Sequence, residues 1–532
     1  MKHSLHRLQW IRMAWLIVPA SMAISSFAQA SASMGAVECA RLQEMNFTEL
    51  PDAATTITTT AVVPASAKDP EYCAVSGYVQ PQIQFELRLP TKTWNGRYLQ
   101  AGCGGFCGSV DIEDCADALS RDFAVAAQNM GHVGNPIRDP LWGSEPGLRR
   151  DFGPRSTHVV ALAAKAIVEK YYGRRPDHSY FRGCSTGGRE ALTEAQMYPK
   201  DFDGLIAGDP AFPARQGGIA NNWDTLQLRT PEGELVLPPE KLRVLHAAVM
   251  KKCDKVDGLV DGIISDPRDC RFDVSSVQCP SGKDGADCLT SAQATAAAKL
   301  YDGPRNSKGE RLVPGYRMYG SELDWRADIR FDLGKGYLRY LGFVQNPPAD
   351  YDPRSFNFDT DVVKLEEMAR LYDSVAPYEA PNLDEFHKSG GKLIVYHGWA
   401  DATVSALGTL DYYAKVVDRG GGIDEVKSWF RVFMVPGMHH CARGNAPNTF
   451  DMLEAMVAWV ERGEAPDRII ATQTDGDKVV RTRPLFPYPT VARYTGKGDA
   501  NDAANWIPAE PRVKRDDNID WIWAPRETSA RR

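Results

Sequence analysis

The stretch of sequence that decides the fold is Gly183-Cys184-Ser185-Thr186-Gly187, which matches the pattern G-x-S-x-G. In that motif a serine occupies a sharp turn between a strand and a helix, and its hydroxyl is exposed above a parallel sheet. Tyr180 and Phe181 are typical of the strand, and good helix formers follow the turn: Arg189, Glu190, Ala191, Leu192 and Ala195. Because the motif is common in glycine-rich chains, its context has to support it.

A second stretch, His439-His440-Cys441, also places a cysteine beside a residue that nucleophilic catalysis uses. If Cys184 and Cys441 form a disulfide, their Cα atoms lie roughly 5.5 Å apart. Ser185 and His440 are then each one Cα step of about 3.8 Å away. Such a bridge favours His440 over His439 as the base and predicts a serine hydrolase. The alternative, Cys184 as a thiol nucleophile, needs a free thiolate.

The segments on either side of these stretches alternate between strand and helix patterns. Before the turn at Ser185 we expect three strands, over 85–89, 97–100 and 123–128. A helix over 157–172, closed by Gly173, follows them. After a long interval we expect strands over 393–396 and 430–435 and an amphipathic helix over 451–462 that ends at Gly463.

The interval between these halves lacks the alternation and holds four cysteines. With 532 residues the chain exceeds the usual size of a single core, so an inserted domain is expected. We therefore predict an α/β fold, with an α/β-hydrolase core of residues 31–210 and 386–532 and a large lid domain inserted at residues 211–385.

A carboxylate should complete the triad, and α/β-hydrolases carry it between the serine and the histidine. Asp401 follows the strand over 393–396 through a short turn, at the carboxyl end of the sheet where such sites form. Asp424 and Asp384 are rivals that follow no convincing strand. In the predicted triad Asp401 orients His440, which takes the Ser185 proton and returns a proton to the leaving alcohol.

Acyl transfer also needs two hydrogen-bond donors for the oxyanion of the tetrahedral intermediate. One is expected from the backbone N–H of the residue after the nucleophile, Thr186. The other comes from a loop after an early strand, and Gly102-Cys103-Gly104-Gly105 has the missing side chains that let backbone approach a substrate. We predict Gly105 as that donor.

The first 30 residues have the pattern of a secretory signal peptide. Lys2, Arg7 and Arg12 precede an apolar run, and Ala28-Gln29-Ala30 is a small-residue cleavage signal. Pro19 and several serines make the run unlike a membrane anchor. The mature chain is expected to be secreted or periplasmic, where its eleven cysteines can pair. Its formal charge, −7 with the leader, argues against nucleic acid or membrane as a partner.

The predicted lid carries an acidic segment from Cys253 to Ile263 with three aspartates and two glycines. Carboxylates and carbonyls in such a loop suit a hard cation that takes six to eight oxygen ligands, which indicates calcium. The spacing is not that of an EF-hand, and a solvated acidic turn is an equal alternative from the residues alone.

The chain resembles the tannase and feruloyl esterase family of secreted α/β-hydrolases, in which a disulfide joins neighbouring Cys-Ser and His-Cys pairs beneath a Ser-Asp-His triad. Cys184-Ser185, Asp401 and His440-Cys441 match that pattern. Further matching stretches are Trp94-Asn95-Gly96-Arg97, Gly102-Cys103-Gly104-Gly105, Tyr396-His397-Gly398, Val435-Pro436-Gly437-Met438 and Trp459-Val460-Glu461-Arg462-Gly463. The resemblance covers nearly the whole mature chain.

The resemblance implies a structural Ca²⁺ and further disulfides. The implied calcium ligands are the side chains of Asp254, Asp257 and Asp261 and the carbonyls of Leu259 and Ile263. The implied bridges are Cys253–Cys270, Cys279–Cys288 and Cys39–Cys73, which leave Cys103, Cys107 and Cys115 unassigned. The family also contains mono(2-hydroxyethyl) terephthalate hydrolase, which has Glu where this chain has Thr186, Phe where it has Val404, and a bridging Cys where it has Phe486.

We accordingly predict a serine carboxylesterase that hydrolyses aromatic, hydroxycinnamate (feruloyl-type) esters through an acyl-enzyme. The substrate would be a small aromatic ester, free or attached to a plant polysaccharide or tannin, and lid aromatic residues would hold its ring: Trp325, Phe331, Tyr337 and Tyr340. A tannase acting on gallate esters and a mono(2-hydroxyethyl) terephthalate hydrolase are alternatives. A non-catalytic, calcium-stabilised binding protein is the alternative of a different class.

Overall fold

The computed structural model of the chain describes residues 34–138, 140–212, 214–315, 317–348, 350–372 and 381–519. The predicted signal peptide, residues 1–30, lies outside these described residues. Within them, no helix combines the length and the apolar character that crossing a membrane requires.

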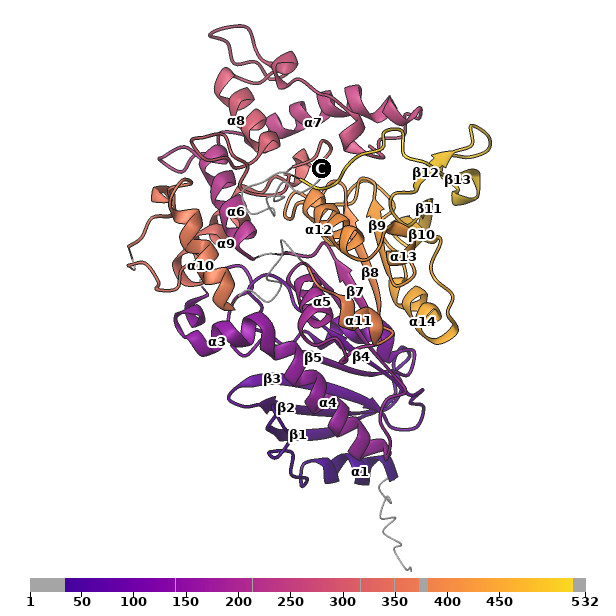
Figure 1. The fold of residues 1–532 in the computed structure, drawn as a ribbon. Helices are drawn as coiled ribbons and strands as arrows, with labels where there is room; N and C mark the ends of the chain where they lie inside the picture. Colours follow the sequence, from indigo (N-terminus) through magenta and orange to yellow (C-terminus); the bar gives the residue numbers. More distant parts are fainter. Residues whose placement is uncertain are drawn as a thin grey trace, which may run out of the picture.

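A nine-stranded mixed sheet forms the centre of the molecule (Figure 1), with the strand order β1-β2-β3-β5-β4-β6-β7-β8-β9. The strands are β1 (Thr55–Val63), β2 (Tyr72–Val79), β3 (Ile83–Pro90), β4 (Arg97–Ala101), β5 (Ala124–Gln128), β6 (His178–Cys184), β7 (Gly204–Gly208), β8 (Lys392–Gly398) and β9 (Phe430–Val435). The first three strands pair antiparallel, and β3 also pairs antiparallel with β5. The six strands β4 to β9 are parallel to one another. This is the predicted α/β-hydrolase sheet with an antiparallel edge.

Successive side chains of a strand point to opposite faces of the sheet. In the parallel strands the side chains on both faces are buried. Phe181, Leu205 and Leu393 pack in the apolar cluster that contains α1 (Met34–Leu42), α4 (Ser156–Tyr172), α5 (Thr186–Met197) and α12 (Ala406–Arg419). Their neighbours Tyr180, Ile206 and Ile394 pack in a second cluster with α2 (Ala116–Leu119) and α14 (Met452–Arg462). Helices therefore cover both faces of the sheet.

The segment predicted as the lid lies between β7 and β8, and we call residues 211–385 the insert. It contains α6 (Ala214–Leu228), α7 (Pro239–Cys253), α8 (Ser291–Asp302), α9 (Ala327–Tyr340) and α10 (Asp361–Tyr372). These helices gather beyond the carboxyl ends of the strands (Figure 1). Part of the insert packs directly on the core, since Tyr337 and Leu338 share an apolar cluster with Phe106 and Phe152.

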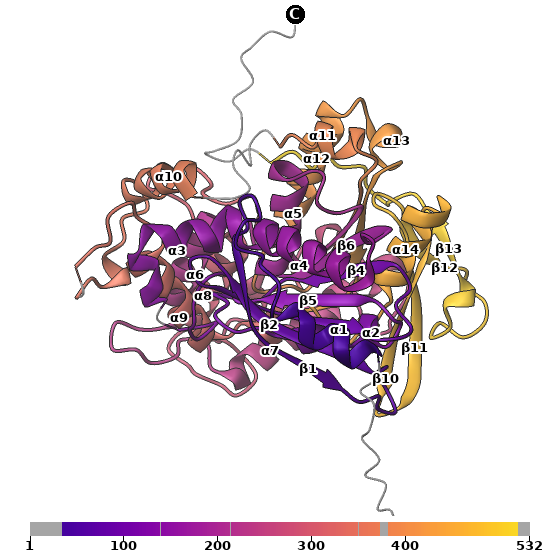
Figure 2. The same ribbon diagram turned by 90° about the horizontal axis from the view of Figure 1, so that it is seen from below.

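Short elements complete the chain: α3 (Pro146–Arg150), α11 (Asp384–Lys388) and α13 (Ile423–Val426). Two antiparallel pairs follow α14, namely β10 (Ile469–Asp475) with β11 (Lys478–Leu485), and β12 (Val491–Tyr494) with β13 (Trp506–Ala509). They lie beside α14 at one side of the molecule (Figure 2).

Five disulfides link the described residues. Four are the expected pairs Cys39–Cys73, Cys184–Cys441, Cys253–Cys270 and Cys279–Cys288. The fifth, Cys103–Cys107, joins two of the three cysteines that the sequence left unassigned. The third, Cys115, is a buried thiol whose pKa burial raises to about 12, so it is an inert core residue rather than a nucleophile.

Candidate active site

Ser185 occupies the sharp turn between β6 and α5. Its backbone has φ 61° and ψ −118°, a conformation that a residue with a side chain rarely adopts. The Ser185 N–H donates to the carbonyl of Gly208 at 2.9 Å, which ties the turn to the end of β7. A Cβ atom on Gly183 would lie 2.6 Å from the backbone of Gly187, so the first glycine of the motif lets the helix fold back against the strand.

The Cys184–Cys441 disulfide brings the nucleophile turn and the histidine loop together. The two Cα atoms are 5.9 Å apart, and Ser185 and His440 line one cleft. His440 Nδ1 lies 2.7 Å from Asp401 Oδ2. This contact leaves Nε2 of His440 for the serine hydroxyl, as a Ser-His-Asp triad requires.

Asp401 is fully buried and its carboxylate is well supplied with donors. The N–H groups of Thr403 and Val404 donate to Oδ1 at 2.5 and 3.0 Å, while Oδ2 faces His440. Burial alone would raise the pKa of Asp401, but His440 and His397 hold it well below its ordinary value. The acid is therefore ionised, which stabilises a protonated His440.

The rival residues occupy other environments. The Asp424 side chain is 98% exposed beside Lys427, and Asp384 pairs with Arg419 on the surface. Burial lowers the pKa of His439, whose ring makes no hydrogen bond within the described part of the chain. His440 and Asp401 are thus the pair that the geometry brings together.

The predicted oxyanion donors lie beside the nucleophile. Gly105 and Thr186 line the same cavity as Ser185, and the Thr186 hydroxyl donates to the Gly105 carbonyl at 2.7 Å. Neither backbone N–H has a hydrogen-bond partner among the described residues, so both are available to a ligand. Gly105 has φ +57°, and a Cβ there would lie 2.1 Å from the Pro136 carbonyl oxygen, so this position requires glycine.

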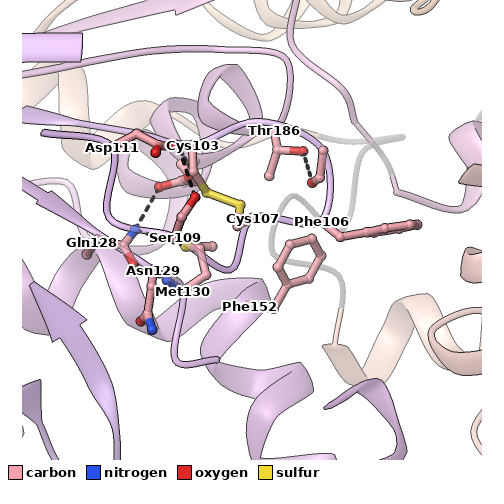
Figure 3. Close-up of a disulfide and its surroundings, with 12 residues drawn as sticks. Cys103, Phe106, Cys107, Ser109, Asp111, Gln128, Asn129, Met130, Phe152 and Thr186 are labelled. Atoms are coloured by element: carbon pink, nitrogen blue, oxygen red, sulfur yellow. Dashed lines mark hydrogen bonds between the residues drawn. A yellow bond between two sulfur atoms is a disulfide. The ribbon is translucent and has the colours of Figure 1, made fainter. Parts of the chain in front are cut away.

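The loop that carries Gly105 is held by contacts that the sequence did not reveal. The Cys103–Cys107 disulfide closes it, next to Thr186 (Figure 3). The buried Glu190 carboxylate on α5 accepts from the Cys103 N–H at 3.1 Å, from Thr157 Oγ1 at 2.7 Å and from Gln128 Nε2 at 3.2 Å. Burial raises the pKa of Glu190 to about 7. Glu190 therefore connects α5, the helix that follows Ser185, to the loop that carries Gly105.

Two hollows meet at Ser185. An inner cavity of about 160 Å³ extends between the core and the insert, and an open cleft of about 630 Å³ leads to the surface. Apolar side chains dominate the inner cavity, including Phe106, Phe152, Phe212, Val313, Leu333, Tyr337 and Val404. Charged side chains line the cleft, including Asp111, Asp324, Arg326, Arg330 and Arg443. An ester bond at Ser185 would thus face a mainly apolar cavity on one side and a cleft with several charged residues on the other.

Of the four insert aromatic residues that the sequence offered for a substrate ring, one lines the inner cavity. Tyr337 lines the inner cavity, whereas Phe331 and Tyr340 line neither hollow. Trp325 is buried within the insert, with its ring 5.1 Å from that of Tyr301. Most aromatic lining comes from the core and the start of the insert, at Phe106, Phe152 and Phe212.

The predicted calcium ligands lie together in the loop after α7. Asp254 accepts from the N–H of Gly262 at 3.1 Å, Asp257 accepts from Ser265 Oγ at 2.6 Å, and Asp261 pairs with Arg483 at 2.6 Å. Leu259 and Ile263 lie in the same loop and donate their N–H groups to Asp257 and Asp261. Among the described residues, sets of three or more carboxylate, imidazole or thiolate ligand atoms within 4.8 Å of one another lie elsewhere. The oxygen donors suit calcium in type, but the three carboxylates do not converge on one point.

Comparison with known proteins agrees with this geometry. The family model "Tannase and feruloyl esterase" matches residues 68–509. The chain is 35% identical to the mono(2-hydroxyethyl) terephthalate hydrolase of Piscinibacter sakaiensis, over 87% of this chain and 89% of that protein. It is 34% identical to a probable feruloyl esterase of Arthroderma benhamiae, over 78% and 80% of the two chains.

A solved structure shows the same fold. The crystal structure of feruloyl esterase B from Aspergillus oryzae superposes with a TM-score of 0.80 at 27% identity, over 89% of this chain and all of that chain. From the match over most of its length and from these relatives, the chain belongs to the tannase and feruloyl esterase family and is a carboxylic ester hydrolase.

Proposed function

We propose that the chain hydrolyses esters of aromatic acids through an acyl-enzyme on Ser185, with hydroxycinnamates preferred and gallates second. The observation that carries this proposal is the apolar inner cavity that opens at Ser185. An apolar cavity of about 150 Å³ is known to take up benzene, so the volume here suits one aromatic ring. The names of the relatives from Arthroderma benhamiae and Aspergillus oryzae support the feruloyl assignment.

In the proposed reaction the Ser185 hydroxyl attacks the ester carbonyl while Nε2 of His440 takes its proton. The N–H groups of Gly105 and Thr186 stabilise the oxyanion, and Asp401 stabilises the protonated His440. His440 then protonates the departing alcohol, which leaves the acyl group on Ser185. Water, deprotonated by His440, hydrolyses the acyl-enzyme and restores the serine.

One polar group in the inner cavity suits the phenolic oxygens of such acids. The Gln216 side chain lines the cavity, is only 8% exposed, and its Nε2 has no partner among the described residues. A buried amide without a partner is costly, and a phenol or methoxy oxygen on the substrate ring would satisfy it. A site of this kind discriminates strongly against analogues that lack the polar substituent.

The alcohol part of the ester is assigned to the charged cleft, where a sugar or polyphenol would meet Asp111, Arg326 and Arg443. This arrangement suits substrates attached to a plant polysaccharide or tannin. Terephthalate monoester is expected to be a poor substrate. Val404 and Thr186 line the cavity where the terephthalate monoester hydrolase has Phe and Glu, so the ring is held differently here.

The test is a panel of esters under one set of conditions: methyl ferulate, methyl cinnamate, methyl gallate, p-nitrophenyl palmitate and mono(2-hydroxyethyl) terephthalate. We expect the highest kcat/KM with methyl ferulate and at least about a tenfold drop when the ring hydroxyl and methoxy groups are absent. Gln216→Leu should remove most of that difference while retaining hydrolysis of p-nitrophenyl acetate. Preference for the palmitate or for the terephthalate monoester would overturn the proposal.

We further propose that the mature chain is exported and that the loop from Asp254 to Ile263 binds structural calcium. Five disulfides support an oxidising compartment. The three aspartates and the carbonyls of the loop support this proposal, because oxygen donors of this type suit calcium, and binding would draw the three carboxylates together.

A further inference from the structure

A second buried aspartate, Asp209, lies beneath the triad and has no part in the mechanism described so far. It follows β7 directly, as Asp401 follows β8 through a short turn, and its side chain is fully buried. The Asp209 N–H donates to the Tyr396 carbonyl at 2.9 Å, so the residue extends the pairing of β7 with β8. Asp209 is therefore fixed by the sheet rather than by a loop.

The Asp209 carboxyl group contacts both segments that carry the acid and the base. Its Oδ1 accepts from the N–H of Gly398, at the start of the turn to Asp401, at 3.0 Å. Its Oδ2 accepts from the N–H of Cys441, the residue after His440, at 3.3 Å and lies 3.6 Å from the sulfur of Cys184. One side chain thus connects the Asp401 turn, the His440 loop and the disulfide.

Asp209 shares one basic neighbour, His397, with Asp401. Carboxyl oxygens of Asp209 and Asp401 and a ring nitrogen of His397 lie within 4.8 Å of one another. His397 Nε2 is nearer to Asp401, at 3.3 Å, than to Asp209, at 3.6 Å, and its Nδ1 contacts Thr409 Oγ1. Tyr396 also interacts with Asp209. Two ionised carboxylates at this separation would repel each other in a buried site, which favours a proton on one of them.

We propose that Asp209 is a positioning residue that acts in its neutral, protonated form, donating its proton to Asp401 while it accepts from Gly398 and Cys441. Burial and the charge of Asp401 both raise the pKa of Asp209, whereas the histidines lower that of Asp401. The two acids are thereby separated into a neutral and an ionised member. The neutral acid holds Asp401 and the His440 loop in register without competing for the His440 proton.

The test compares two substitutions at Asp209. Asp209→Asn keeps the shape and the neutral charge, since its amide nitrogen can donate to Asp401 and its oxygen can accept from Gly398. It loses only the longer contact from the Cys441 N–H. It should retain kcat within about threefold of the wild type. Asp209→Ala removes the contacts and should lower kcat at least about tenfold with little change in KM, because small displacements of catalytic groups are costly. Asp203→Asn, before the opposite end of β7, is the matched control and should leave kcat unchanged.

A spectroscopic readout keeps the inference independent of folding and of the proposed substrate. The infrared difference spectrum between wild type and Asp209→Asn should contain the carbonyl stretch of a protonated carboxyl group at mildly alkaline pH. Damage by Asp209→Asn equal to that by Asp209→Ala, or absence of that band, would overturn the inference. Because it rests on the proposed acyl-enzyme mechanism, Ser185→Ala is assayed in parallel, and an active Ser185→Ala enzyme would refute the mechanism itself.

Discussion

At the scale of single residues, the position of His440 relative to Asp401 favours His440 over His439 as the proposed base. His440 contacts Asp401 at 2.7 Å, whereas His439 lacks such a contact although it is adjacent in the chain. We predict that His440→Ala lowers kcat/KM at least about a thousandfold, since loss of a triad member removes general-base catalysis. His439→Ala is the matched control and should stay within about tenfold of wild type. Kinetics with methyl ferulate measures both, and the reverse order would contradict the assignment.

Glu190 gives a prediction on the pH dependence of stability. Burial raises the pKa of Glu190 from an ordinary value of 4.5 to about 7. Between these values the unfolded chain releases the proton that the folded chain retains, so this group lowers the free energy of unfolding as pH rises through that window. Glu190→Gln lacks this effect, and its free energy of unfolding relative to wild type should increase across the window.

Denaturant titrations at about pH 5 and about pH 8 measure that difference. Glu169→Gln, a substitution of a carboxylate on α4 that pairs with Arg175 at the surface, should give the same difference at both pH values. A difference for Glu190→Gln that does not change with pH would show that the carboxyl group is not held in its protonated form.

At the scale of elements, the Cys184–Cys441 bridge connects the β6–α5 turn to the loop after β9. The two cysteines are 257 residues apart in sequence, so the bridge restricts the unfolded chain strongly. Replacing both by Ala should lower the free energy of unfolding by about 2–5 kcal/mol and lower kcat as well. The pair Cys279–Cys288, only 9 residues apart within the insert, is the control. Its removal should cost less stability and leave kcat unchanged, and full activity without the Cys184–Cys441 bridge would count against a positioning role.

The sequence was sufficient to predict which of the proposed catalytic groups lie together, because each of two groups is next to a cysteine of the same disulfide. Ser185 adjoins Cys184, and His440 adjoins Cys441, so one bridge locates two side chains. Asp209 escaped notice because β7 is only five residues long and includes two glycines, which is a weak strand pattern. Glu190 and the Cys103–Cys107 pair act through contacts between segments that are far apart or tightly folded, which no local pattern encodes.

The placement of the aromatic residues of the insert has a geometric cause. Leu333 and Tyr337 are four residues apart on α9 and share the face that lines the cavity. Phe331 lies on a different face of the same helix, Tyr340 is the last residue of the helix, and Trp325 precedes the helix and packs inside the insert. Composition within a segment indicates that a ring is present, but the helix period decides where it points.

At the scale of the whole molecule, buried arginines attach the insert to the turn that follows β8 and carries Asp401. Arg330 on α9 donates to the carbonyl of Ala402 at 2.6 Å and to Thr403 Oγ1 at 2.8 Å, and Arg317 contacts the same carbonyl and Asp224. The residues next to Asp401 are therefore held by the insert. Stability of the insert and order of the active site should be coupled, although the chemistry belongs to the core.

The proposed calcium site provides a way to perturb the insert. We predict that a chelator lowers the melting temperature, because an ion that binds only the folded state at a hundredfold excess over Kd stabilises it by about 2.7 kcal/mol. Asp257→Ala should melt at the chelated temperature and no longer respond to chelator. Asp287→Ala, an exposed position in the insert, should respond like the wild type. A wild-type melting curve that is unchanged by chelation would contradict the calcium proposal.

The most direct test of the central claim, that Ser185 is the nucleophile of this esterase, is covalent labelling with a fluorophosphonate followed by peptide mapping. The account predicts one modified site, at Ser185, formed at the same rate at which ester hydrolysis is lost. Ser185→Ala should remain unlabelled although it is folded, and His440→Ala should label much more slowly. Modification at a different residue, or loss of activity without any modification of Ser185, would contradict the account.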